Sequence, residues 1–154
     1  MKKKIIVFSI LVVSLFLLVG CGKKKEEEKF EVTLNGVDVT PGVKFDDKKI
    51  DEEYSYSEVP DCAFGGKGII YTYENVEIST KEDGTIYSVY FLNTNAKTKE
   101  GLSVSDDKAK VKELYGDPKK DENNQMIYRR GKVELTINIS NSYVGGIEYI
   151  LVEE

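Results

Sequence analysis

The sequence predicts an α+β domain in which an antiparallel sheet carries one or two short helices packed on one face. Residues 133–140 alternate between apolar and polar side chains, as a half-buried strand does. Asn35-Gly36 is a strong signal for a two-residue hairpin turn. Residues 105–115 have the apolar spacing and the end signals of a helix. We expect helix and strands to recur as a tandem repeat.

The first 20 residues have the features of a secretory signal peptide. A basic start, Met1–Lys4, precedes the 15 uncharged residues Ile5–Val19. This apolar run is shorter than the roughly 20 residues that a membrane-spanning helix needs. We therefore expect residues 1–20 to be a cleaved leader, with an uncleaved single-pass anchor as the alternative.

The leader ends in Leu18-Val19-Gly20-Cys21, which resembles the lipobox of bacterial lipoprotein precursors. The resemblance implies that a diacylglyceryl group is attached to the Cys21 thiol and that a peptidase cuts between Gly20 and Cys21. Two acyl chains hold a protein stably at a bilayer, whereas a single chain is marginal. The mature protein is thus expected at the extracytoplasmic face of the cell membrane, with the lipid bilayer as a partner through acylated Cys21.

A charged tether is expected to follow, so that residues 21–29 comprise the lipidated cysteine and this tether. Gly22–Lys29 contains no apolar side chain and cannot pack into a core. The apolar pattern begins at Phe30, and residues 30–154 have the length of a single domain.

The domain is expected to open with a hairpin formed by Phe30–Leu34 and Val37–Val39, which alternate in polarity. Asp46–Tyr54 is a candidate short helix, because its acidic start suits a helix N-terminus. Ser55–Lys67 contains proline and glycine and is expected to be a loop. Three strands are then expected: Gly68–Tyr73, Asn75–Thr80 and Thr85–Leu92.

The clearest helix of the chain is expected at Ser105–Tyr115. Ser105 can cap its start, while Gly116 and Pro118 end it. The segment 117–124 is expected to be a polar turn, and Asn141–Gly146 a loop. The remaining strands are expected at Gln125–Arg130, Lys132–Ser140 and Gly146–Val152.

Short matches between the two parts of the domain indicate half-repeats at residues 30–95 and 96–154, each too small to form a core alone. Chance similarity between amphipathic elements is the alternative. The matched segments are Asp46-Asp47-Lys48 with Asp106-Asp107-Lys108, Tyr54 with Tyr115, Ile70-Tyr71 with Ile127-Tyr128, Val76-Glu77-Ile78 with Val133-Glu134-Leu135, and Val89–Leu92 with Ile147–Ile150.

The chain also resembles a group of uncharacterised lipoproteins of clostridia and related Gram-positive bacteria. The resemblance covers nearly the whole mature chain. It implies no catalytic residue, because the group has no assigned activity. In architecture the chain is similar to the tandem-repeat β-lactamase-inhibitor-like fold and to small assembly lipoproteins of outer membranes, and architecture alone does not imply function. The segments that carry the group resemblance are the lipobox, Val59–Phe64, Tyr71–Tyr73, Glu77–Thr80, Thr98–Leu102 and Val111–Gly116.

Residue types that most enzymes need are scarce. The chain has no histidine, which removes the commonest general base and the commonest metal ligand. Cys62 lacks a disulfide partner if Cys21 is acylated, and the adjacent Asp61 disfavours a thiolate, so we interpret Cys62 as a small buried residue. We expect no enzyme activity, and predict no catalytic residue.

Three other motifs have plain structural interpretations. Asp46-Asp47 and Asp106-Asp107 lack the spacing of a calcium loop and are interpreted as helix caps. Gly65–Gly68 lacks the spacing of a phosphate-binding loop. We therefore predict no metal and no cofactor.

Charge and aromatic content bear on the partners. Loss of the lysines at positions 2–4 with the leader would lower the net charge from -5 to near -8, so nucleic acid is not an expected partner. Tyrosines on predicted strands form either a recognition surface or part of the core, and packing is the favoured interpretation. These tyrosines are Tyr71, Tyr73, Tyr87, Tyr90 and Tyr149.

These observations predict a non-catalytic binding or protein-interaction module at the cell envelope, for an envelope protein or a small ligand. The first alternative is an envelope hydrolase that uses two carboxylates about 5–10 Å apart. The second is a structural protein of the envelope.

Overall fold

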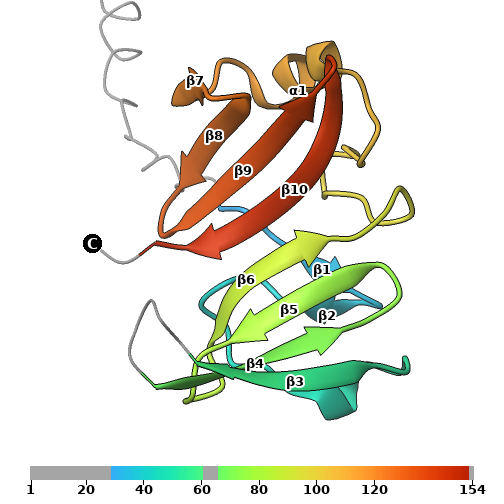
Figure 1. Ribbon diagram of the computed structural model, residues 1–154, viewed down its shortest axis with the longest axis vertical. Coiled ribbons are helices and arrows are strands. Elements are labelled where there is room, and N and C mark those ends of the chain that lie inside the picture. The colour runs from blue at the N-terminus through green and yellow to red at the C-terminus, as the bar shows by residue number, and fades with distance from the viewer. Residues whose placement is uncertain (1–28, 61–65, 153–154) are drawn as a thin grey trace, which may run out of the picture.

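A computed structural model describes residues 29–60 and 66–152 of the protein. The described chain forms one eight-stranded antiparallel sheet and a separate two-stranded hairpin (Figure 1). The leader and the tether, residues 1–28, lie outside the described residues.

The first half of the domain begins with the small hairpin β1 (Thr33–Leu34) and β2 (Val37–Asp38). A single 3₁₀ turn, η2 (Asp47–Lys49), follows. Four consecutive antiparallel strands complete this half: β3 (Ser55–Pro60), β4 (Lys67–Thr72), β5 (Val76–Thr80) and β6 (Ile86–Phe91).

The second half begins with α1 (Lys108–Tyr115). Asp107 caps this helix, because its side chain accepts a hydrogen bond of 2.7 Å from the Ala109 N–H. Four antiparallel strands again follow: β7 (Lys120–Glu122), β8 (Gln125–Arg130), β9 (Val133–Ser140) and β10 (Tyr143–Leu151).

The two sets of four strands join through their last members. The strand order is β3-β4-β5-β6-β10-β9-β8-β7, so β6 and β10 pair at the centre and β3 and β7 form the edges (Figure 1). We call the β6–β10 pairing the seam. Val89 lies opposite Tyr149, and Phe91 lies opposite Ile147.

The register at the seam defines a pseudo-two-fold axis. The symmetry relates each β6 residue to the β10 residue whose number is higher by 58. It therefore exchanges Val89 with Ile147 and Phe91 with Tyr149, and so converts the pair Val89–Tyr149 into the pair Ile147–Phe91. The pair Tyr90–Glu148 is its own equivalent and therefore lies on the axis. Because paired residues of antiparallel strands point to the same face, this axis runs perpendicular to the sheet.

The backbone outside the seam follows the same symmetry. In each half, the segment that leads into the helical element (η2 or α1) forms three backbone hydrogen bonds with the residues at the start of the fourth strand (β6 or β10) or just before it. In the first half these run from Gly42 N to Ile86 O (2.8 Å), Ile86 N to Val43 O (2.9 Å) and Phe45 N to Gly84 O (2.9 Å). In the second half they run from Ser105 N to Val144 O (2.8 Å), Val144 N to Asp106 O (2.8 Å) and Lys108 N to Ser142 O (2.9 Å).

Equivalent bulges interrupt the two halves at the same place. Tyr87 is the extra residue between β5 and β6, and Gly145 is the extra residue between β9 and β10. The symmetry relates Tyr87 to Gly145, because both follow the 58-residue offset. Each bulge bends its strand just before the seam.

Aromatic packing repeats as well. The rings of Tyr54 and Tyr73 lie 5.3 Å apart at 44°, and those of Tyr115 and Tyr128 lie 5.3 Å apart at 43°. The structural equivalent of Tyr128 is thus Tyr73, whereas the sequence match paired Tyr128 with Tyr71. The difference arises because strand register, which short sequence matches do not contain, sets the equivalence.

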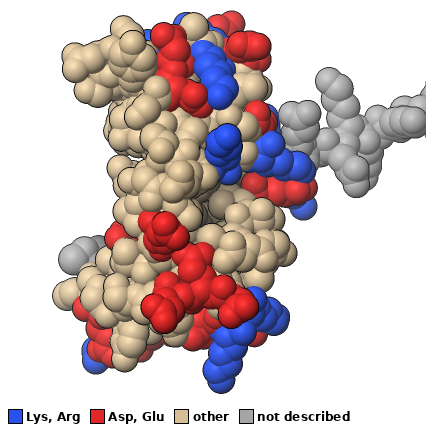
Figure 2. All heavy atoms as spheres, turned by 90° about the vertical axis from the view of Figure 1, so that its right-hand side faces the viewer, with Lys and Arg blue, Asp and Glu red and all other residues tan. Residues whose placement is uncertain are grey.

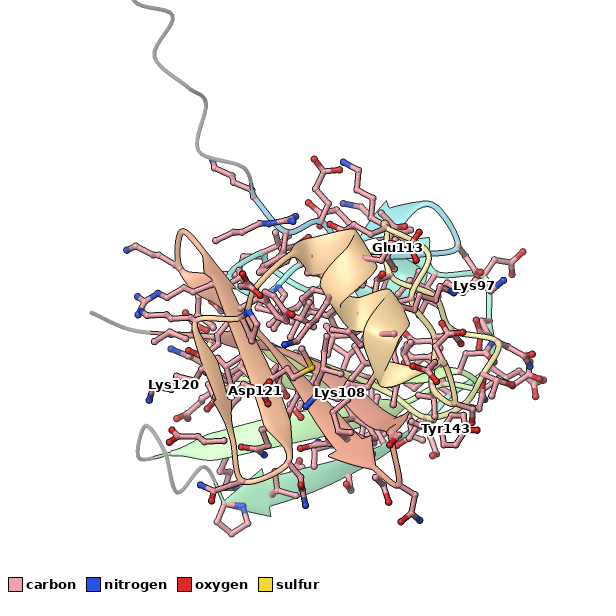
Figure 3. The ribbon with its side chains drawn as sticks, turned by 90° about the horizontal axis from the view of Figure 1, so that it is seen from above. Lys97, Lys108, Glu113, Lys120, Asp121 and Tyr143 are labelled. Atoms are coloured by element: carbon pink, nitrogen blue, oxygen red, sulfur yellow. The ribbon has the colours of Figure 1, made fainter. Side chains whose placement is uncertain are left out.

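One face of the sheet, here called the covered face, holds the core. The N-terminal segment and α1 both lie on this side (Figures 1 and 3). An ion pair of 3.2 Å between Lys108 and Asp121 joins the start of α1 to β7 (Figure 3). The largest fully buried side chains are Tyr149, Ile78, Ile86, Leu102, Met126, Leu135, Ile137, Ile147, Val39, Val89, Val111 and Val144.

Phe30 begins the core immediately after the charged segment. It is 3% exposed and packs against Tyr149 with ring centroids 5.5 Å apart. The Arg130 guanidinium lies 4.4 Å from the Phe30 ring centroid and donates a hydrogen bond of 2.8 Å to Glu100. The start of the domain is therefore held firmly against the second half.

The α+β prediction is wrong. The structure is mostly β, and α1 is the one α-helix among the described residues. The candidate helix Asp46–Tyr54 forms only η2, because Asp46 makes no side-chain cap and Ile50 is already extended. So short a segment, with few apolar side chains, does not sustain a helix.

Strand boundaries correct three further expectations. Part of Ser55–Lys67, expected as a loop, forms the exposed edge strand β3, whose last residue Pro60 is tolerated because an edge strand has a free side. β7 occupies part of the expected polar turn. β10 begins at Tyr143, inside the expected loop Asn141–Gly146, because the bulge at Gly145 accommodates the glycines.

The symmetry yields a stability prediction at Gly42 and Ser105. Gly42 has φ +98°, and its equivalent Ser105 has φ +72°, a region that is unfavourable for side chains. We expect Ser105→Gly to raise the free energy of unfolding by about 0.5–1 kcal/mol and Gly42→Ser to lower it by at least about 1 kcal/mol. Urea unfolding of both variants measures this, and a destabilised Ser105→Gly would contradict it.

Candidate functional site

The second face of the sheet, here called the open face, is covered by no described helix or strand (Figures 1 and 3). Its centre is a row of cross-strand neighbours that crosses the pseudo-two-fold axis. The row is polar in its middle, unlike the core on the covered face. In order it contains Thr72, Glu77, Tyr90, Glu148, Thr136 and Ile127.

Tyr90 of β6 is at the centre of this row, and its side chain extends over the neighbouring strand β10. A Cβ on Gly146 would approach the Tyr90 hydroxyl oxygen to 2.8 Å and the Tyr90 ring to 3.4 Å. Gly146 thus leaves the space that the phenol occupies. Asn138 Nδ2 would lie 3.4 Å from the same Cβ, so an amide stands beside the phenol.

Glu148 makes the contact that the symmetry relates to that of Tyr90. Tyr90 of β6 reaches Gly146 of β10, and Glu148 of β10 reaches Ser88 of β6. Its carboxylate interacts with the hydroxyl of Ser88, the residue equivalent to Gly146. Burial raises the pKa of Glu148 above its ordinary value, the Ser88 hydrogen bond opposes this shift, and the nearby charge of Glu77 adds to it. A carboxyl group with a raised pKa therefore lies on the axis.

This arrangement can bind hydrogen-bond donors and cations. Glu77 and Glu148 lie in one row on β5 and β10 with β6 between them, so their backbones are roughly 10 Å apart. Tyr90 stands between them and offers a ring face and a hydroxyl. The central charge is negative, while Arg129 and Lys120 lie toward the β7 edge of the sheet.

The sequence singled out five tyrosines, and the structure divides them. Tyr73 and Tyr149 are in the core, at 2% and 1% exposed, which agrees with packing for these two. Burial raises the pKa of Tyr73 to about 12. Tyr87 lies at the β6 bulge, and Tyr90 alone of the five lies on the axis at the open face.

Tyr71 belongs to an aromatic cluster near the β3 edge of the sheet. Its ring lies 4.6 Å from that of Phe45, 5.5 Å from that of Tyr54 and 6.4 Å from that of Tyr56. Tyr54 donates a hydrogen bond of 2.5 Å to Asp47, which raises the pKa of the phenol. Tyr56, at 66% exposed, is the most exposed large hydrophobic residue of the described chain.

The acidic pairs have local structural partners. Asp107 caps α1, and Asp106 accepts a hydrogen bond from Ser103 N and pairs with Lys110 at 2.8 Å. Asp46 pairs with Lys49 at 3.4 Å. Among residues 29–60 and 66–152, no group of three or more acidic or cysteine side chains could hold a metal ion.

Several predicted positions lie outside the described residues. These are Gly20 and Cys21 of the lipobox, together with Asp61, Cys62 and Gly65. Gly68 is described, and it belongs to β4, where a Cβ would lie 2.9 Å from Thr80 O. Close strand packing, rather than phosphate binding, thus accounts for this glycine. No helix in the described part is long and apolar enough to cross a membrane.

Sequence reasoning missed Glu77, Glu148 and Gly146 as neighbours. Alternation of polarity along β10 placed Glu148 on the face of the strand away from its apolar residues. Only the strand register shows that Glu148 is a neighbour of Tyr90 and Ser88. A glycine pair at the start of a strand was the available signal, because interior glycines mark bulges or close contacts.

Comparison with known proteins does not identify this site. No family profile, no curated protein and no solved structure matches the chain.

The raised pKa of Glu148 predicts a pH-dependent gain from Glu148→Gln. The folded state disfavours the charged carboxylate, so this group's stability contribution is present below its ordinary pKa and is lost as the pH rises through the raised value. Glutamine carries no such penalty and can still bond Ser88. We expect the variant to gain stability over the wild type between pH 4 and pH 7, by urea unfolding.

Glu134→Gln is the matched control on the same face. Glu134 lies opposite Arg129, so its replacement removes a cross-strand neighbour of opposite charge. We expect no stabilisation of this variant at pH 7. An equal gain from both substitutions would show that overall charge, and not burial of Glu148, is the cause.

Proposed function

We propose that the protein is a lipid-anchored extracytoplasmic binding module whose open sheet face is the binding surface. The observation that carries the proposal is the central row, in which Glu77, Tyr90 and Glu148 form a polar surface that no described helix or strand covers. A sheet face that served packing alone would be apolar, as the covered face is.

The charge of this row indicates the chemistry of the partner. Glu77 and Glu148 suit cationic groups and N–H donors, and the Tyr90 ring face suits a cation or an apolar group. We therefore propose a partner in the envelope that presents amine or guanidinium groups. The net charge of the protein, -5 for the full chain, favours the same kind of partner.

The lipobox and the position of Phe30 support an anchored display of this surface. Residues 22–29 can span at most roughly 28 Å when extended, so the domain would stay close to the bilayer. Phe30 is packed in the core against Tyr149, with the Arg130 guanidinium over its ring. The tether would therefore join the domain at a residue that is held in place by the core. The acidic surface would be repelled by anionic lipid, which favours contact with a partner over contact with the bilayer.

A carboxylate-based hydrolase is the second candidate. The raised pKa of Glu148 and the presence of Glu77 in the same row favour it, because two carboxyl groups, one of them with a raised pKa, are the pattern of glycan hydrolysis. A binding module tolerates Glu148→Gln with weakened binding, whereas a hydrolase with this variant binds its substrate and loses turnover. Release of reducing sugars from cell-wall glycan distinguishes the two.

Anchoring predicts that Cys21→Ser abolishes labelling by a radioactive fatty acid and causes the unprocessed precursor to accumulate. Cys62→Ser is the matched control, because it removes the only other cysteine and leaves the lipobox intact. We expect the control to be labelled like the wild type. Lipidated Cys21→Ser protein would contradict the anchoring proposal.

Binding at the open face predicts a position-specific crosslink in intact cells. The photo-reactive residue p-benzoylphenylalanine would replace Tyr90 at the open face or, as control, the exposed Tyr143 at the start of β10. We expect an adduct from position 90 that weakens when Glu77→Gln and Glu148→Gln are added. Equal adducts from both positions, or none from position 90, would contradict the proposal.

A further inference from the structure

Two pairs of a tyrosine and a carboxylate occupy related places in the two halves of the domain. In the second half, the Tyr115 hydroxyl lies 2.9 Å from Glu100 Oε2. In the first half, the hydroxyl of Tyr54, the equivalent of Tyr115, donates a hydrogen bond of 2.5 Å to Asp47. Because each phenol also packs on a strand tyrosine in nearly the same geometry, the two pairs can be compared directly.

A guanidinium group completes the pair of the second half. Arg130 Nη1 donates a hydrogen bond of 2.8 Å to Glu100 Oε1, the carboxylate oxygen that Tyr115 leaves free. The same guanidinium lies 5.8 Å from the Tyr115 ring centroid and 4.4 Å from that of Phe30. A planar guanidinium suits this place because it pairs with a carboxylate and stacks on aromatic rings at the same time.

The pair of the first half has no such cation within the described residues. Asp47 forms no ion pair there. No described Lys or Arg lies over the ring of Tyr54, Tyr56 or Tyr71. Asp47 is half-buried, while Tyr54 and Tyr56 are 38% and 66% exposed. The first half therefore offers an accessible carboxylate and accessible rings, the kinds of group that hold Arg130 in the second half.

These groups lie beside the free edge of β3. Tyr56 belongs to β3, and its ring lies 6.4 Å from that of Tyr71, which in turn lies 5.5 Å from that of Tyr54. β3 pairs only with β4, and within the described part of the chain Ser55–Pro60 forms no other hydrogen bond between backbone groups (Figure 1). A free strand edge is a template for the addition of a further strand.

The opposite edge of the sheet is protected against such an addition. β7 is three residues long, and all three are charged. One of them, Asp121, also pairs with Lys108 of α1 at 3.2 Å. Short length and charged side chains are means by which edge strands avoid pairing. β3 lacks both kinds of protection, because it has six residues and Glu58 is its one charged side chain.

The charge around β3 favours a basic segment. Residues 46–58 contain six acids and two lysines. Figure 2 shows Asp and Glu side chains gathered on the lower half of the molecule, the half that holds β3 in Figure 1. A cationic side chain is therefore attracted to this edge.

We propose that β3 binds an extended, arginine-bearing segment of a partner protein as an additional antiparallel strand. An arginine of this segment points to the side of the sheet that holds Tyr56. Its guanidinium pairs with Asp47 and stacks on the rings of Tyr54 and Tyr56, and so supplies from outside what Arg130 supplies within the second half. β4 and β5 separate β3 from the seam, so this site is distinct from the open-face surface of the proposed function.

Peptides that differ in one side chain test the proposal by NMR titration of the full chain in detergent. The probe is acetyl-SVTRTVS-amide, whose residues favour an extended strand. Its central arginine is replaced by lysine or by citrulline, a neutral analogue of similar shape. We expect the arginine peptide to bind saturably and to slow hydrogen exchange of backbone amides in Ser55–Val59. The lysine peptide is expected to bind about threefold more weakly and the citrulline peptide about tenfold more weakly.

Asp47→Asn is the decisive variant, because its amide can still accept the Tyr54 hydrogen bond but cannot pair with a cation. We expect this variant to bind the arginine peptide only as well as the citrulline peptide. Asp46→Asn is the matched control, because it removes an equal charge from the neighbouring residue, which pairs with Lys49 at 3.4 Å. The control should keep the preference for arginine. Glu148→Gln, at the open face, should keep it as well.

Four outcomes overturn the proposal. The first is equal binding of the arginine and citrulline peptides. The second is equal loss of the preference in Asp46→Asn and Asp47→Asn, which would reduce the effect to overall charge. The third is unchanged exchange of the β3 amides, or binding of L-argininamide alone as tight as that of the peptide. The fourth is a dimer in sedimentation whose β3 amides are already protected, which would assign the edge to a second copy of the chain. Failure here leaves the crosslinking result at position 90 unaffected.

Discussion

The antiparallel pairing of β6 with β10 is the contact on which the rest of the domain depends. Each set of four strands has one apolar face, and neither set has enough elements to enclose it alone. Joining the last strands makes one sheet with one continuous core, in which Val89, Phe91, Ile147 and Tyr149 are buried at the centre. The same pairing places the two-fold axis through the sheet, so both faces acquire a centre where the two halves meet.

That centre differs in chemistry between the two faces. On the covered face, the N-terminal segment and the residues around Thr98 close over aromatic rings and leave a hollow. On the open face, Tyr90 and Glu148 each reach across to the opposite strand and contact Gly146 and Ser88. The candidate site on the open face therefore arises from the seam.

Local patterns predicted much of the strand content, because polarity alternates with a period of two wherever one face is buried. Gln125–Arg130 was predicted with the bounds that the structure has, and Val133–Ser140 within one residue. The failures have physical causes. An exposed edge strand such as β3 has no buried face and hence no pattern, and the bulge at Gly145 resembles a loop in sequence. Neighbours such as Tyr90 and Glu148 depend on pairing between strands distant in sequence, which local patterns do not contain.

The symmetry also shows where the two halves differ. Away from the seam, equivalent residues keep their roles: Tyr54 and Tyr115 each pack on a strand tyrosine in nearly the same geometry. At the axis the chemistry changes, with Tyr90 opposite Glu148 on the open face and Phe91 equivalent to Tyr149 on the covered face. Packing alone would be satisfied by keeping the same residue type at both positions of each pair. A ligand or partner that lies on a two-fold axis but lacks two-fold symmetry would contact different groups on the two sides, and the pair Tyr90 and Glu148 presents such different groups at the open face.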